Sequence, residues 1–135
     1  MPFELFTGQR PVILEPAITI QKKGAISLNR AAYAALSSPE AAELLFDPEE
    51  RQVGIRKADP SAAHAMPVRP LGERGSSWLI SGRSFAIYYG IPVDTARRWL
   101  AQVVDGMLVV DLKEPGTDVS GVRHRARQAD PAGTG

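Results

Sequence analysis

The sequence contains no cysteine, and none of its 135 residues belongs to an apolar run long enough to cross a membrane. The absence of cysteine excludes disulfides, thiolate nucleophiles and cysteine-ligated zinc, and it favours a reducing compartment. A spanning helix needs about 20 apolar residues, and the start of the chain has neither a basic leader nor a long apolar stretch. The sequence therefore predicts a soluble, cytoplasmic protein that has no membrane partner.

An excess of charge of one sign is also lacking. The chain has 16 Lys and Arg residues against 15 Asp and Glu residues, a net charge of +1. A strong positive net charge is by itself an indication of nucleic-acid binding. Since this chain lacks one, any such binding must come from a local patch of basic residues. Hydrophobic residues make up 44% of the chain, which predicts one compact domain or two very small units that share a core.

Motifs of catalysis and metal binding are missing as well. His64 and His124 have no carboxylate or second histidine at ligand spacing. The sequence shows no glycine-rich phosphate loop, no serine elbow and no isolated pair of apolar-flanked carboxylates. We therefore predict no catalytic residue, no metal and no cofactor, and we do not expect an enzyme.

The first half of the chain has the pattern of a β-α-β-β unit over residues 18–57, after an N-terminal arm over residues 1–17. Apolar residues alternate over residues 18–28, which predicts a half-buried strand interrupted by a turn at Lys22-Lys23-Gly24. Asn29 is a suitable N-cap for a short helix over residues 30–37. Strands over residues 43–46 and 52–56 flank a turn at residues 47–50.

A proline-rich segment, residues 58–72, predicts a stiff and exposed linker. A second β-α-β-β unit follows over residues 73–113, with a helix from Arg83 to Tyr89 that ends at Gly90. Asp105-Gly106 predicts a hairpin turn before a strand over residues 107–112. The segment 96–103 fits a helical stripe or a strand, and we predict a strand by analogy with the first unit. The tail, residues 114–135, is expected to be disordered apart from its basic cluster.

A shift of 52 positions along the chain relates the two predicted units. It places Leu28 on Ile80 and Tyr33 on Phe85, and burial parity is kept. A unit of about 40 residues cannot bury both faces of its strands alone. We therefore expect a mainly β protein with short helices, in which two tandem units interlock around one core.

The segments 22–36, 43–47 and 52–56 resemble the AbrB/SpoVT swapped-hairpin family of bacterial DNA-binding transition-state regulators. Gly24, Ile26, Leu28, Arg30 and Leu36 match the family pattern in order and spacing. Ala25, Asn29 and Ser37 stand where the pattern has arginine, proline and glycine. Two such units resemble the tandem MraZ regulators or a fused AbrB dimer. The resemblance implies one interlocked AbrB-like barrel and a role in transcription regulation.

Lysine and arginine residues give the candidate contacts to DNA phosphates. Adjacent Arg97 and Arg98 point to opposite sides if they lie in a strand. Tail arginines could enter a groove as a flexible arm, and aromatic residues (Tyr88, Tyr89, Trp78 and Trp99) either stack on bases or, as we favour, fill the core. The predicted nucleic-acid-binding residues are Lys22, Lys23, Arg30, Arg74, Arg83, Arg97, Arg123, Arg125 and Arg127.

Two functions remain open from the sequence. The first is a DNA-binding transcriptional regulator that contacts the phosphate backbone of double-stranded DNA through a local basic face. The alternative is a non-catalytic protein-interaction or assembly module that keeps the fold without binding DNA. Its contacts would be the acidic turn at residues 47–50, the apolar arm and the linker. The basic residues would then form only a solvated turn and a solubilising tail. A homo-oligomer is compatible with both functions.

Overall fold

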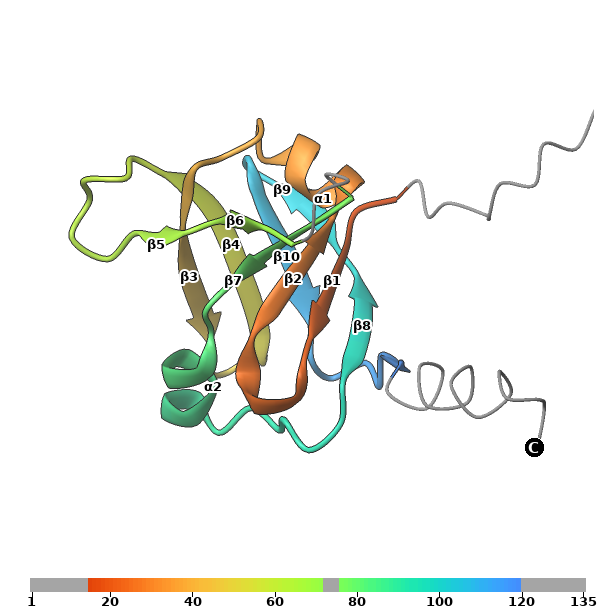
Figure 1. Cartoon of the computed structure of the whole chain (residues 1–135). Coiled ribbons are helices and arrows are strands. Elements are labelled where there is room, and N and C mark those ends of the chain that lie inside the picture. Colours follow the sequence, from red (N-terminus) through yellow and green to blue (C-terminus); the bar gives the residue numbers. More distant parts are fainter. Residues whose placement is uncertain (1–14, 72–75, 120–135) are drawn as a thin grey trace, which may run out of the picture.

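The computed structural model describes residues 15–71 and 76–119. These residues form two antiparallel sheets and a few short helices, so the prediction of a mainly β fold is confirmed (Figure 1). Their helical elements are a 3-10 turn, η1, and two α-helices. Their bounds are η1 Lys22–Gly24, α1 Arg30–Ala35 and α2 Arg83–Tyr89.

The first sheet has six strands in the order β11-β8-β1-β2-β7-β6. Its strands are β1 Ala17–Ile20, β2 Ile26–Asn29, β6 Arg69–Pro70, β7 Ser77–Ile80, β8 Arg97–Leu100 and β11 Thr117–Asp118. The second sheet has five strands in the order β5-β3-β4-β10-β9. Its strands are β3 Ala41–Asp47, β4 Gln52–Ala58, β5 Met66–Pro67, β9 Gln102–Val104 and β10 Met107–Asp111.

The two halves of the chain meet strand against strand in both sheets. In the first sheet β2 pairs with β7, and Ser27 lies opposite Leu79. In the second sheet β4 pairs with β10, and Ile55 lies opposite Leu108. Outside these central pairs each half adds its own hairpin partner, β1 and β6 in one sheet and β3 and β9 in the other. The first neighbours of the central strands thus correspond in the two halves, while β8 and β11 extend the first sheet beyond β1, and β5 extends the second sheet beyond β3.

The predicted local signals of helices and turns are present. The Asn29 side chain accepts a hydrogen bond from the Ala32 N–H at 2.9 Å, as an N-cap does. Gly90 ends α2 in the left-handed conformation at φ 64. Asp105 and Gly106 both have positive φ, 53 and 77, which is the signature of a two-residue hairpin turn.

The segment that fits either a helix or a strand forms strands. β8 and β9 lie on either side of Ala101, so the chain passes from the first sheet into the second at this residue. Trp99 lies in β8, opposite Ile18 of β1. The prediction of a strand here is therefore confirmed.

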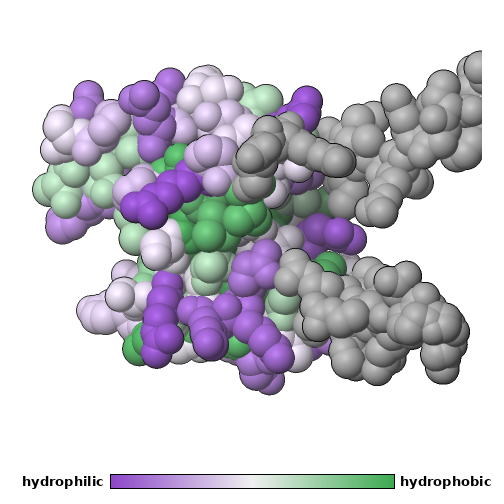
Figure 2. Space-filling model, in the orientation of Figure 1, coloured by the Kyte–Doolittle hydropathy of each residue, from purple (hydrophilic) through white to green (hydrophobic). Residues whose placement is uncertain are grey.

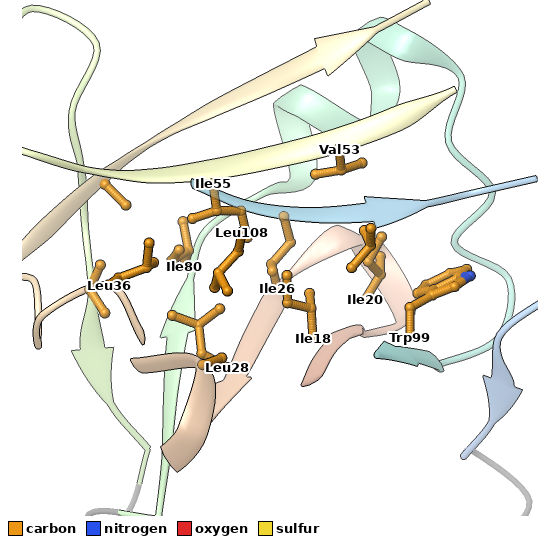
Figure 3. Close-up of a cluster of buried hydrophobic side chains, with 14 of the residues drawn as sticks. Ile18, Ile20, Ile26, Leu28, Leu36, Val53, Ile55, Ile80, Trp99 and Leu108 are labelled. Atoms are coloured by element: carbon orange, nitrogen blue, oxygen red, sulfur yellow. The ribbon is translucent and has the colours of Figure 1, made fainter. Parts of the chain in front are cut away.

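The hydrophobic core lies between the two sheets (Figure 3). Alternate residues of the first sheet face alternate residues of the second, and each of these side chains is almost fully buried. The aromatic ring of Tyr33 stacks on Trp78 at a centroid distance of 3.8 Å and so closes the core beneath α1. The labelled core residues are Ile18, Ile20, Ile26, Leu28, Leu36, Val53, Ile55, Ile80, Trp99 and Leu108.

The prediction that residues 58–72 form an exposed linker is wrong for residues 66–70, which contain two short strands, whereas most of residues 59–65 are exposed and outside strands, as predicted. β5 pairs with β3, and β6 pairs with β7. Between them Val68 is buried, and its N–H donates to the Glu40 carbonyl at 3.0 Å. The prolines occupy two-residue edge pieces, where a missing N–H is tolerated, and this concealed the strands in the sequence.

Three further boundaries differ from the predictions. The expected tail contains β11, in which Thr117 pairs with Arg98, while residues 120–135 lie outside the described residues. Ala17, assigned to the arm, begins β1. The helices do not follow the shift that relates the strands, because Ser81 and Gly82 separate β7 from α2 whereas α1 follows β2 directly.

Candidate nucleic-acid interface

The two lysines of the first predicted turn lie at an exposed corner of the first sheet. The Gln21 N–H donates to the Ala25 carbonyl at 2.7 Å, and the Gly24 N–H donates to the Gln21 carbonyl at 3.0 Å. Lys23 adopts φ 71 within this turn. Both Lys22 and Lys23 are exposed, so their ammonium groups can reach an external anion.

This turn rests directly on the beginning of α2. A Cβ at Gly24 would lie 2.8 Å from Arg83 Cα, and a Cβ at Gly82 would lie 2.6 Å from the Gly24 carbonyl oxygen. Two backbones can approach this closely only when both positions lack a side chain. The contact brings Lys22 and Lys23 from the first half beside Arg83, the exposed first residue of α2, from the second.

Arg97 and Arg98 alternate across β8, as predicted for neighbours in a strand. Arg97 lies opposite Ile20, and its guanidinium donates to the Pro115 carbonyl at 3.1 Å. Arg98 lies opposite Thr19. Both arginines are only partly exposed. Because Arg97 also has an internal hydrogen-bond partner, it contributes less to the exposed basic corner than expected.

Among the described residues, another predicted basic residue, Arg30, lies apart from this corner. Arg30 is exposed and begins α1, at the far end of β2 from η1. A strand rises about 3.3 Å per residue, so the four residues of β2 span about 13 Å. The remaining predicted positions, Arg74, Arg123, Arg125 and Arg127, lie outside the described residues.

The basic corner, defined as Lys22, Lys23 and Arg83, takes part in none of the ion pairs found within residues 15–71 and 76–119. The Lys23 N–H donates to the Val93 carbonyl at 3.4 Å, and the residue after Val93, Asp94, carries an exposed carboxylate. Hydrophilic residues gather on the lower part of the face in Figure 2, where η1 and α2 lie in Figure 1. The corner therefore keeps a local positive charge.

The acidic turn is partly neutralised by a lysine from the other half. The Asp47 carboxylate accepts from the Glu49 and Glu50 N–H groups at 3.0 and 3.1 Å. The Lys113 ammonium pairs with Glu50 at 3.2 Å and with Asp111 at 3.3 Å. This turn is thus a closed local network and presents less free negative charge than its sequence indicates.

Three of the four aromatic residues named from the sequence pack on the core, as favoured. Trp99 is nearly buried and donates its indole N–H to the Glu114 carbonyl at 3.0 Å. Trp78 and Tyr89 lie against the core cluster. Tyr88 is 80% exposed on the outer side of α2, so for this residue the prediction of a core position is wrong.

A hydrophobic residue accompanies Tyr88 on the outer side of α2. Ile87 is 65% exposed, and the adjacent Tyr89 packs inward on Phe46 at a centroid distance of 4.5 Å. Helical periodicity requires apolar residues on the buried face only, and the run from Phe85 to Tyr89 is apolar all round. This excess is the signal by which the sequence could have shown an exposed apolar surface.

His64 is exposed, and the described part of the chain has no group of three or more His, Asp or Glu residues that could hold a metal ion. Among the same residues no helix is long and apolar enough to span a membrane. Comparison of the chain with protein-family models, curated proteins and solved structures finds no match.

Proposed function

We propose that this protein is a DNA-binding transcriptional regulator of the AbrB type, and that its basic corner contacts the phosphate backbone of double-stranded DNA. One observation carries the proposal. The Gly24–Gly82 contact holds two exposed lysines of the first half beside an exposed arginine of the second half. Lys and Arg contacts to phosphate supply affinity and orientation without reading the sequence.

The fold that goes with this proposal is an interlocked AbrB-like barrel made of two tandem units. Its support is the repeated pairing order around the β2–β7 and β4–β10 pairs. Each unit would leave one edge of β2 and β4, or of β7 and β10, without a partner, so only the two units together complete the sheets. A fused pair of this kind would place both sets of DNA contacts in one chain.

The basic corner sets the expected strength of binding. Each neutralised phosphate contributes about −0.9 to the slope of log affinity against log salt, so three contacts predict a slope of about −2.7. A net charge of +1 adds little long-range attraction. We therefore expect modest affinity that weakens steeply with salt.

Fluorescence anisotropy with a labelled duplex of mixed sequence, measured over a series of salt concentrations, tests the proposal. Replacing Lys22→Gln and Lys23→Gln together removes two phosphate contacts and should reduce the magnitude of the slope by about 1.8. Arg83→Gln should reduce it by about 0.9. Lys57→Gln is the matched control, because Lys57 is an exposed lysine on β4 of the other sheet and should leave the slope unchanged.

The outcomes test two hypotheses separately, namely that the protein binds DNA and that the basic corner is the surface that binds it. If the parent chain does not bind the duplex at low salt, DNA binding is rejected. If it binds but K22Q/K23Q keeps the parent slope, DNA is bound elsewhere and the basic corner is not the interface. An equal loss in K57Q would show that the effect is one of total charge.

A second function is favoured by the exposed apolar side of α2. Ile87 and Tyr88 offer a large aromatic and a branched aliphatic side chain at an otherwise polar surface, which is typical of protein-interaction sites. A non-catalytic interaction or assembly module would use them. A protein captured by the parent chain, lost with Ile87→Ser/Tyr88→Ser and kept by K22Q/K23Q, would support this function over DNA binding.

A further inference from the structure

The free edge of β9 exposes apolar residues at one end of the second sheet. β9 is the last strand of that sheet among the described residues. Leu100, Val103 and Val104 are 60, 52 and 43% exposed along β8 and β9. An open edge with apolar side chains is a template for another strand, and proteins normally cover such edges.

The chain enters the described structure beside this edge. Ala17 pairs with Leu100, and the Ala101 N–H donates to the Pro16 carbonyl at 2.9 Å. The antiparallel pairing of β1 with β8 therefore continues one residue backward to Pro16. If this register continues toward the N-terminus, the residues before Pro16 come opposite β9.

The backbone at residues 15 and 16 already has the alternation of a strand. The Glu15 carbonyl accepts from the Asn29 side-chain amide at 2.9 Å, on the β2 side, while the Pro16 carbonyl faces β8. Carbonyls of successive residues in an extended chain point to opposite sides. The chain bends at Glu15. This bend lies beside Ala101, the residue that separates β8 from β9. A strand that pairs with β8 and then with β9 must bend at the same place.

The β9 edge offers the matching hydrogen-bonding groups. Because the Ala101 N–H points to the β1 side, alternation places the N–H and C=O of Val103 on that side too, at the open edge. Val104 lies opposite Met107 across the two-residue turn, so its backbone groups face β10 instead. Val103 thus presents a donor and an acceptor to an incoming strand.

We propose that residues 12–14, Val12-Ile13-Leu14, add to β9 as a further antiparallel strand, in the register of β1 and β8 continued past Pro16. This register sets Leu14 opposite Val103 and Ile13 opposite Val104. Three successive β-branched or aliphatic residues suit an edge strand. The added strand covers the exposed valines and supplies backbone partners for Val103.

The absence of cysteine from the sequence allows a direct test with the full chain. In the proposed register Ile13 and Val104 form a non-hydrogen-bonded pair, whose Cα atoms lie about 4.5 Å apart, within disulfide range. Ile13→Cys/Val104→Cys should convert under mild oxidation to a disulfide within one chain. The control Ile13→Cys/Tyr88→Cys carries an even more exposed partner, on α2, and should not convert.

Equal cross-linking of both pairs, or no cross-link in either, would overturn the proposal. A disulfide only between two chains would show that a second copy, and not the same chain, covers β9. As an independent measurement, amide exchange at Val103 should be slow in the parent, because in this register the Val103 N–H donates to the Leu14 carbonyl. Rapid exchange at Val103 in the parent would also reject the strand.

Discussion

Gly24 and Gly82 pack backbone against backbone, with the Gly24 carbonyl oxygen 2.6 Å from the position that a Cβ on Gly82 would occupy. The two residues come from different halves of the chain and are both buried. Their contact joins the η1 turn to α2 and sets the separation of Lys23 from Arg83. The basic corner therefore depends on two residues that carry no charge.

Replacing Gly24 with alanine should destabilise the protein by about 2–4 kcal/mol. Gly24 has φ 97, and its Cβ would lie 2.8 Å from Arg83 Cα, so the cost combines a left-handed backbone with overpacking. Gly106→Ala is the matched control, because Gly106 has φ 77 with nothing within 4 Å and should cost only about 1–2 kcal/mol. Urea unfolding measures the free energy of unfolding of both variants. An equal decrease in the two would show that the close Gly24–Gly82 contact does not contribute to the cost.

The Asn29 side chain supports the start of α1 and the start of β1 together. Its Oδ1 accepts from Ala32 and Ala17 N–H groups at 2.9 and 3.0 Å, and its Nδ2 donates to the Glu15 carbonyl. Asn29→Ala should cost about 1–3 kcal/mol, a cap plus a second hydrogen bond. Asn29→Asp keeps both acceptor bonds and should recover most of this loss in thermal unfolding. If the two variants are equally unstable, the Nδ2 donor dominates instead.

The Tyr33–Trp78 stack links α1 of the first half to β7 of the second half. Tyr33→Ala should cost about 1–3 kcal/mol, because both the stacking energy and part of the buried area are lost. Tyr33→Phe keeps the ring and should stay within about 0.5 kcal/mol of the parent. Chemical unfolding followed by tryptophan fluorescence measures the difference. A large loss in Tyr33→Phe would indicate that the hydroxyl, and not the stack, is the important group.

The Asp111 carboxylate, at the end of β10, makes the stability of the protein depend on pH. The backbone N–H of Lys113 donates to it at 2.9 Å and, together with the Lys113 ammonium, holds the pKa of Asp111 below its usual value. A lowered folded-state pKa contributes stability above the unfolded pKa of about 3.9, and this is lost as pH falls through the folded value. Asp111→Asn should therefore be less stable than the parent near pH 7, and the difference should shrink as pH falls below the unfolded pKa of about 3.9. A difference in stability that does not change as the pH is lowered would contradict this.

Local sequence signals predicted the local structure well. Asn29 caps α1, Gly90 ends α2, and Asp105-Gly106 turns between β9 and β10. Each of these depends on residues within one turn of the chain, where propensity and capping decide the outcome. Alternation of apolar residues likewise identified the strands that carry Ile26 and Ile55 into the core.

Features that depend on distant residues could not be predicted in the same way. Gly24 was visible as part of a turn, but its close approach to Gly82 exists only because β2 pairs with β7. β5 and β6 have no alternation to reveal them, because each is two residues long and contains a proline. The gathering of Lys22, Lys23 and Arg83 at one corner needed the fold, whereas the separation of Arg30 follows from the length of β2.

The pairing of β2 with β7 and of β4 with β10 has a consequence during synthesis on the ribosome. When residues up to β4 have emerged, the inner edges of both sheets still await strands that have not been translated, so the nascent chain carries two open edges. Contacts between residues this distant in sequence also form slowly. Two unfinished chains on one messenger RNA could complete each other's sheets, and short spacing between ribosomes would favour that exchange.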